Sequence, residues 1–375
     1  MDQENFDNYR ELQKHLDSMP VGYPATESGI EIKILKHLFT PEQAKIALKL
    51  NFMADPLNKI FRRLKKSDFS LEELEDKLDE MYFNGLINRG LVKEGETETK
   101  YYGSAPIVVG FFEYQLNRLT PEFFKDAHEY LHHTFFSEEY HSSGVPQLRV
   151  IPLNQTVNSE QSIAQYDDLK DLIENIGEPI AIMECICRKG ADLIGEPCTR
   201  TKIRESCLSF RTAAKSFIEK GLAREISKEE ALKFLEKAEE DGLVLQPGNS
   251  QRPMNICACC GCCCGVLTSH TQLPEFAHLF ATNYRAEVDT ELCVVCGVCE
   301  DRCNVDAIHV EDDFAVVDKN RCIGCGVCVP TCTSEAISLI KKEEEILPPR
   351  NTLATFTKIM DKKAELARAE KTQIQ

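Results

Sequence analysis

The stretches CVVCGVCEDRC (residues 293–303) and CIGCGVCVPTC (residues 322–332) decide the architecture of the C-terminal part of this sequence. Each places four cysteines in the spacing C-x₂-C-x₂-C-x₃-C, and the second copy follows the first at a constant offset. The match extends to flanking positions, where Ala286 and Val288 correspond to Ala315 and Val317, and Ala307-Ile308 to Ala336-Ile337. The sequence therefore contains an internal duplication built around thiolate ligands.

The spacing suits an iron–sulfur centre with several irons. Three thiolates two residues apart on a tight loop each reach a different iron of one cubane, whereas the fourth lies too far round to close the same cube. The duplicated stretches resemble the bacterial ferredoxins with two 4Fe–4S clusters, in which the fourth cysteine ligates the other cluster. The resemblance implies one cluster on Cys293, Cys296, Cys299 and Cys332, and a second on Cys322, Cys325, Cys328 and Cys303.

Three glycines, Gly297, Gly324 and Gly326, keep these loops small, so we expect backbone N–H groups beside the cofactor to tune its potential. In the resembling family proline usually follows the fourth cysteine, whereas Asn304 and Thr333 stand here, which affects loop rigidity and potential rather than ligation. Zinc sites also use C-x₂-C pairs, but they need only four ligands and usually have longer gaps. The duplicated set of eight favours iron.

Ten further cysteines precede the duplication: Cys185, Cys187, Cys198, Cys207, Cys257, Cys259, Cys260, Cys262, Cys263 and Cys264. Packing alone does not gather six thiols into eight residues, so we predict metal ligation. The count allows two more four-thiolate clusters, or one cluster plus a zinc or redox-active site. Because consecutive side chains of an extended loop point apart, the neighbours Cys259/Cys260 and Cys262/Cys263/Cys264 are expected to split between sites.

The segments ECICR, GEPC, SCLSF and NICACCGCCC together resemble a bacterial family of ferredoxin-domain proteins with a similar N-terminal region. Cys259-Cys260-Gly261 also echoes the CCG cysteine domain of heterodisulfide-reductase-like proteins, but a second copy is absent. Neither resemblance implies chemistry beyond iron–sulfur.

Composition narrows the class further. The chain has 375 residues and a formal net charge of −17, which disfavours nucleic acid and anionic membranes as partners. No apolar run is long enough for a membrane helix, and the polar N-terminus does not read as a signal peptide. Dense thiols without an export signal predict metal ligands in a reducing cytoplasm, in an anaerobic setting.

The sequence of residues 1–145 predicts helices followed by a hairpin, and the chain as a whole is predicted to have an α+β fold. Thr40-Pro41 and the capping box that begins at Ser70 start two helices, and strand-like runs follow at 86–90 and 100–102. The run FSLEELEDKLDEMYFNGLI followed by KYYG resembles the third helix and wing of a winged-helix domain. This helix is strongly acidic and would repel phosphate, so we interpret the domain as a protein-docking module.

The remaining chain divides into a Cys-rich α/β metal-binding domain at 146–270, a two-cluster ferredoxin-like domain at 271–340 and a charged C-terminal tail at 341–375 that includes an exposed helix. Within 146–270 the patterns predict a helix at 166–176, a buried strand at 179–183, a helix at 205–220, and a helix from Ser227 to Gly242.

His128-Glu129-Tyr130-Leu131-His132 matches the zinc-protease signature H-E-x-x-H. A third ligand is not evident, because Glu138 stands where the longer signature has a histidine. Aromatic neighbours such as Phe124 and Phe135 indicate a packing face instead, so we do not interpret this motif as a protease site.

These features predict a cytoplasmic electron carrier, or a non-catalytic electron-transfer subunit of an oxidoreductase, with a flavoprotein or metalloenzyme as its redox partner. The alternative is a redox or oxygen sensor that acts through the winged-helix-like domain, for which a basic surface would argue. Catalysis at the Cys185–Cys264 site is a third possibility. No nucleotide-binding fingerprint is present.

Overall fold

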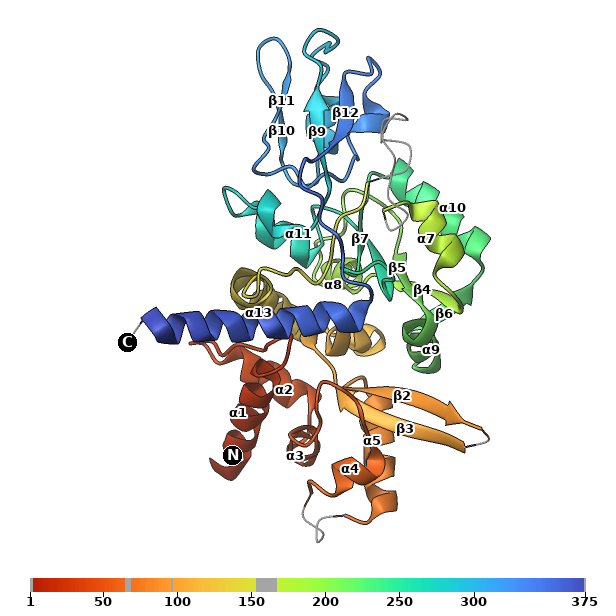
Figure 1. Ribbon diagram of the computed structural model, residues 1–375, viewed down its shortest axis with the longest axis vertical. Coiled ribbons are helices and arrows are strands. Elements are labelled where there is room, and N and C mark those ends of the chain that lie inside the picture. The colour runs from red at the N-terminus through yellow and green to blue at the C-terminus, as the bar shows by residue number, and fades with distance from the viewer. Residues whose placement is uncertain (1–2, 65–68, 96, 153–166, 374–375) are drawn as a thin grey trace. The chain divides into compact units, whose positions relative to one another are not determined.

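The computed structural model describes residues 3–64, 69–95, 97–152 and 167–373. The chain forms two compact units, Met1–Glu139 and Tyr140–Gln375, and both mix helices with strands (Figure 1). Tyr166, the predicted start of a helix, lies outside the described residues. None of the described helices combines the length and the apolar character that a membrane crossing requires.

The first unit begins with helices, whose bounds are α1 Gln3–Asp17, α2 Ile30–Leu38, α3 Pro41–Ala47, α4 Leu57–Phe61 and α5 Leu71–Phe83. The predicted starts of α3 and α5 are confirmed, since Thr40 and Ser70 each form a complete capping box. Gly85, with φ of 69°, ends α5 as expected. The inward faces of these helices bury Leu35, Ile46, Leu74 and Leu78.

A three-stranded antiparallel sheet completes this part of the unit, in the order β1 (Asp55–Pro56), β3 (Thr97–Ser104), β2 (Ile87–Glu94). The predicted hairpin is therefore confirmed. Asp79 of α5 fastens both long strands, because its carboxylate accepts hydrogen bonds from Arg89 (2.8 Å), Lys100 (2.6 Å) and the Tyr102 hydroxyl (2.9 Å). The unit continues through η1 (Ile107–Phe111), η2 (Glu113–Arg118), α6 (Pro121–Tyr130) and η3 (Leu131–Glu139).

The second unit contains an antiparallel sheet of five strands in the order β6 (Ala223–Ile226), β4 (Ile180–Glu184), β5 (Glu205–Phe210), β8 (Asn255–Cys259) and β7 (Val244–Pro247). Helices α7 (Leu169–Asn175), α9 (Arg211–Glu219) and α10 (Lys228–Glu240) flank it, and α8 (Ile186–Leu193) and α11 (Gly265–Thr271) follow cysteine-bearing ends of β4 and β8 (Figure 1). The predicted strand at 179–183 and the Ser227 helix start are confirmed.

The predicted helix at 205–220 is wrong in its first half. Glu205–Phe210 is β5, a nearly fully buried strand that pairs with both β4 and β8. Arg211 then turns the chain with φ of 54°, and only from there does α9 begin. A strand buried on both faces has no alternating pattern, so sequence periodicity could not separate it from the helix that follows.

The strands that flank the two duplicated stretches pair between the copies. Strand β9 (Tyr284–Val288) precedes the first copy and pairs with β12 (Ile337–Lys341), which follows the second copy (Figure 1). Strand β10 (Ile308–Val310) pairs with β11 (Ala315–Val317), so Val288↔Ile337 mirrors Val317↔Ile308. Each copy therefore pairs its flanking strands with the other copy. Helix α12 (Val298–Arg302) lies between β9 and β10 in the chain, and η6 (Val329–Thr331) lies between β11 and β12.

The last element is α13 (Thr352–Gln373), the helix expected in the tail. Its first turn is fastened within the second unit, because the Thr355 hydroxyl donates a 2.5 Å hydrogen bond to the carbonyl of Asn249. Within the described part of the unit, Ala277–Leu279 forms the short helix η5.

Candidate iron–sulfur centres

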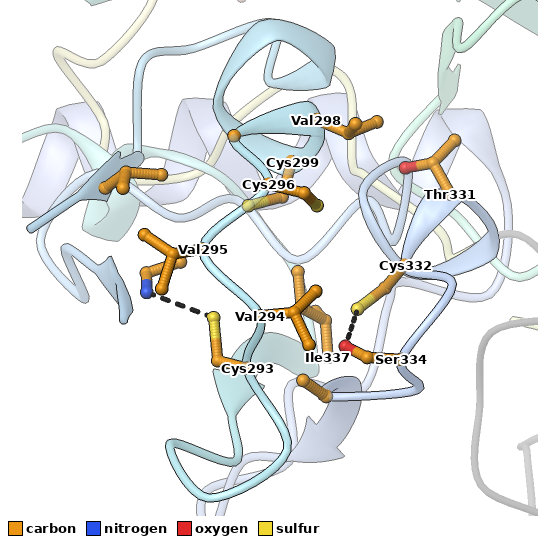
Figure 2. A pocket seen from close by; sticks show the side chains of 14 residues that line it. Cys293, Val294, Val295, Cys296, Val298, Cys299, Thr331, Cys332, Ser334 and Ile337 are labelled. Carbon is orange, nitrogen blue, oxygen red and sulfur yellow. Dashed lines mark hydrogen bonds between the residues drawn. The ribbon is translucent and has the colours of Figure 1, made fainter. Parts of the chain in front are cut away.

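A cavity in the duplicated region is lined by four cysteines, Cys293, Cys296, Cys299 and Cys332 (Figure 2). The first three come from the loop that leads into α12, whereas Cys332 follows η6 in the other copy. The structure thus places three thiols of one repeat around the same space as the fourth thiol of the other. Gly297, with φ of 76°, makes the turn that starts α12.

Apolar side chains complete this cavity: Val294, Val295, Val298, Val310, Ala315, Ala336 and Ile337. Two groups that line the cavity lie within hydrogen-bonding range of its sulfurs. The backbone N–H of Ala315 donates to Cys293 Sγ at 3.4 Å, and the Ser334 hydroxyl lies 3.6 Å from Cys332 Sγ (Figure 2). Burial acts to raise the pKa of Cys332, but hydrogen bonds from Ser334 and the backbone of Ala336 and Ile337 outweigh it and lower that pKa.

The thiols of Cys303, Cys322, Cys325 and Cys328 form a second set. Burial, and then the charges of the other three thiols, raise the pKa of Cys328, and burial with the charges of Cys303 and Cys322 raises the pKa of Cys325 to about 12. Electrostatic interactions thus connect Cys325 and Cys328 with the other thiols of this set.

Backbone donors follow the duplication in this second set. The Ala286 N–H donates to Cys322 Sγ at 3.4 Å, and the Ala307 N–H donates to Cys303 Sγ at 3.3 Å. Ala286 and Ala315 are equivalent positions, and each donates to the first cysteine of the other copy. Gly324 has φ of 66°, and a Cβ there would overlap the carbonyl oxygen of Tyr284; Gly326 has φ of 75°. The loop at Gly324 therefore lies directly against the backbone of Tyr284, two residues before the donor Ala286.

Both sets fit the group that the sequence pattern implies. Each offers four thiols, the ligand type of a 4Fe–4S cluster, and each has a backbone N–H that donates to a sulfur. Around the first set the lining is mostly apolar.

The ten cysteines that precede the duplicated stretches separate into two groups. Four of them, Cys198, Cys260, Cys262 and Cys263, have sulfurs that all lie within 4.8 Å of one another. Cys259 and Cys260 therefore fall in different groups, as expected. The trio Cys262/Cys263/Cys264 also divides, because Cys264 lies outside the quartet. Cys262 and Cys263, however, stay in one group, because residues 261–263 form a turn rather than an extended loop and both side chains reach the same side.

The other six are Cys185, Cys187, Cys207, Cys257, Cys259 and Cys264. Neighbours within this group raise one another's pKa through hydrogen bonding: Cys207 raises the pKa of Cys257, Cys257 that of Cys259, and Cys259 that of Cys264. A hydrogen bond with Cys185, together with burial and the charges of Cys185 and Cys264, raises the pKa of Cys187. The sheet explains the grouping, since Cys207 and Cys257 are direct partners on β5 and β8.

Arg188 lies between the two groups and was not singled out by sequence reasoning. Its side chain is 1% exposed and donates hydrogen bonds to Ser206 Oγ (2.5 Å) and the carbonyl of Ala258 (2.8 Å). A hydrogen bond with Cys187 and the charge of Arg188 lower the pKa of Cys185, and a hydrogen bond with Cys263 and the same charge lower the pKa of Cys260. A buried arginine beside thiolates offsets their charge. The sequence signal was its position directly after Cys185-Ile186-Cys187.

The cysteine loops contact the duplicated region through Asn304. Its side-chain oxygen accepts a 2.9 Å hydrogen bond from the Gly261 N–H, and its side-chain nitrogen donates one of 2.8 Å to the Gly242 carbonyl. Arg200, two residues after Cys198, donates to the carbonyl of Cys303 at 3.2 Å. Asparagine in place of the usual proline therefore has a structural role that the sequence did not reveal.

The H-E-x-x-H motif spans α6 and η3. His128 and Glu129 are exposed and His132 is half-buried, with the two imidazole centroids 4.0 Å apart. Phe124 and Phe135 are buried, as the packing interpretation requires. Within the described ranges no third Cys, His, Asp or Glu joins these histidines in a compact ligand group.

Comparison with known proteins supports the iron–sulfur chemistry. Residues 315–338, which include the second cysteine stretch, match the 4Fe–4S binding domain family. Neither a curated protein nor a solved structure matches the chain. The matched domain and the cysteine groups identify an iron–sulfur protein with a 4Fe–4S binding domain.

Proposed function

We propose that this iron–sulfur protein is an electron carrier, or the electron-transfer subunit of a larger oxidoreductase, with two 4Fe–4S clusters in its C-terminal part. The observation that carries the proposal is the cavity in which Cys293, Cys296 and Cys299 of one repeat face Cys332 of the other. Cys322, Cys325, Cys328 and Cys303 would hold the second cluster. When bound, such clusters supply reversible one-electron transfer.

The chain's own residues would set the potential and the direction of transfer. The backbone donors of Ala286, Ala307 and Ala315 point at ligand sulfurs, and hydrogen bonds to sulfur raise the reduction potential. Buried Ala315, Ala336 and Ile337 exclude water from one side of the first set. Three valines near that set, Val294, Val295 and Val298, are themselves 38% exposed or more, so this end of the module supports electron exchange with a partner.

The six-thiol group of the preceding domain is a candidate for a third cluster. It contains more than the four thiolates a cubane needs, and the buried guanidinium of Arg188 supplies compensating charge. Electrons would then pass between this group and the ferredoxin-like domain, since the contact of Gly261 with Asn304 joins the two regions.

We further propose that residues 1–139 include a winged-helix domain used for docking. The order of β1, α4, α5 and the β2–β3 hairpin, with β1 paired to β3, supports this fold. Exposed Glu72, Glu73, Asp76 and Glu80 on α5 favour a protein partner with a basic surface, such as a flavoprotein or metalloenzyme, over DNA and therefore over the sensor alternative.

Anaerobic purification with iron and acid-labile sulfide analysis and EPR tests the proposal. Two clusters require about eight irons per chain, and a third at the six-thiol group requires about twelve. Reduced protein should show the EPR signals of 4Fe–4S clusters, and electrons should pass from it to an acceptor protein. A chain that contained zinc throughout, with no sulfide, would refute the proposal.

A further inference from the structure

The quartet Cys198, Cys260, Cys262 and Cys263 has a geometry of its own. Cys198 comes from the loop after α8, and the other three come from the turn between β8 and α11. Four sulfur–sulfur separations, Cys198–Cys260, Cys198–Cys262, Cys260–Cys262 and Cys262–Cys263, are each 3.6 Å. Among the residues that the structure describes, this is the one group of three or more Cys, His, Asp or Glu whose ligand atoms all lie within 4.8 Å of one another.

These separations match ligands that share one ion. Zinc–thiolate bonds of about 2.3 Å in a tetrahedron place neighbouring sulfurs about 3.8 Å apart. In a cubane each thiolate binds a different iron and points outward from its corner, so its sulfurs lie farther apart than that. The quartet has the spacing of a single-ion site.

The ferredoxin-like sets provide an internal comparison. Cys293, Cys296, Cys299 and Cys332 line one cavity, yet they do not form a group with all sulfurs within 4.8 Å. The same chain therefore shows two spacings, a wide one at the repeats and a narrow one at the quartet. The narrow spacing belongs to cysteines outside the repeat pattern.

The surroundings of the quartet suit a closed structural ion. Cys260 and Cys263 are buried, Cys198 is half-buried and Cys262 is exposed, and no fifth ligand accompanies the four thiols within the described ranges. Four thiolates on a divalent ion leave a net negative charge, and the Arg188 guanidinium lies against Cys260 to offset it.

We propose that Cys198, Cys260, Cys262 and Cys263 bind one zinc ion in a closed tetrahedral site. This site fastens the loop after α8 to the turn at 260–263. Both segments also contact the duplicated region, through Arg200 to Cys303 and through Gly261 to Asn304. The ion is therefore a structural clamp, distinct from the electron-carrying clusters, that fixes the cysteine-rich domain against the ferredoxin-like one.

The test is metal analysis of the full chain, produced with both iron and zinc available and purified anaerobically. The wild-type chain is expected to contain one zinc, and zinc-edge X-ray absorption should show four sulfurs at about 2.3 Å. Cys198→Ser removes one of the four proposed zinc ligands, so it should lose most of the zinc without lowering iron and sulfide. Cys207→Ser, a buried cysteine outside the quartet, should keep the zinc.

A wild-type chain without zinc overturns the proposal, as does a Cys198→Ser variant that loses iron, whether one atom or four. The absorption measurement needs no variant, so poor folding of Cys198→Ser does not affect it. Because zinc and iron are counted separately, failure here leaves the electron-transfer proposal intact, and failure of that proposal would appear in iron, sulfide and EPR.

Discussion

The backbone N–H of Gly261 donates a 2.9 Å hydrogen bond to the side-chain oxygen of Asn304. Gly261 lies within the densest run of cysteines, and Asn304 directly follows a predicted cluster ligand, Cys303. A Cβ at Gly261 would overlap the carbonyl oxygen of Asn304, so the two backbones meet at a distance that only glycine permits. The contact brings two cysteine-rich regions together by backbone and side-chain atoms that are not themselves ligands.

Replacing Asn304 with alanine should weaken the second unit. Asn304 is 5% exposed, and its loss leaves the Gly261 N–H and the Gly242 carbonyl without these hydrogen bonds. The expected loss in free energy of unfolding is about 1–3 kcal/mol. Anaerobic denaturant unfolding measures it, with Asn320→Ala, an exposed asparagine, as the control expected to stay within about 0.5 kcal/mol. Equal effects of the two variants would contradict the role of Asn304.

Gly324→Ala should be far more damaging than an alanine at another left-handed glycine. Any L-residue at φ of 66° costs about 1–2 kcal/mol, and here the new Cβ would also overlap the Tyr284 carbonyl. The matched control is Gly195→Ala, where φ is 83° but no atom lies within 4 Å of the added Cβ. Unfolding midpoints and iron content are the readouts. Gly195→Ala should lose only the stability that the unfavourable φ costs, and it should keep its iron. Similar losses of stability in both variants would show that the close approach of Gly324 to Tyr284 is unimportant.

Paired cysteine variants test the crosswise ligands. If Cys293 and Cys332 serve one cluster, Cys293→Ala with Cys332→Ala should perturb one EPR signal and leave the other as in the wild type. Cys293→Ala with Cys303→Ala should perturb both signals, because each cluster loses one ligand. The opposite result, with both signals perturbed only in the first pair, would mean that each repeat ligates its own cluster.

Asp79 should make the stability of the first unit depend on acid. Burial acts to raise its pKa, but hydrogen bonds from Lys100, Arg89 and Tyr102 outweigh this and lower the pKa below its ordinary value of 3.8. A carboxyl group with a lowered pKa adds stability above its unfolded pKa, and that stability is lost as the pH falls through the folded value. Asp79→Asn should therefore cost about 1 kcal/mol at neutral pH, because the site is partly exposed, and should flatten the decline below pH 4. Unfolding free energies measured across this range give the comparison, and parallel curves would contradict it.

Local features of the fold could be predicted from the sequence. Thr40, Ser70 and Ser227 begin helices where their side chains predict, because a cap acts through the few residues that follow it. The hairpin after α5 and the strand after Pro179 also lie where expected. The helix predicted from residue 205 failed, because Glu205–Phe210 becomes a strand through burial between β4 and β8, partners distant in the sequence.

The sequence by itself determined the duplication, the eight thiols of the repeats and the iron–sulfur chemistry, because cysteine spacing within a loop is a local property. The tertiary structure decided which thiols share a space. Val288↔Ile337 and Ile308↔Val317 exchange strands between the copies and carry Cys332 to the cavity of Cys293. The tertiary structure also divided the ten remaining cysteines into the quartet and the six-thiol group. The turn at 261–263 and the loop at Cys198 meet only after the chain has folded. Sulfur positions depend on backbone paths that meet from distant parts of the chain, and no local pattern encodes where they meet.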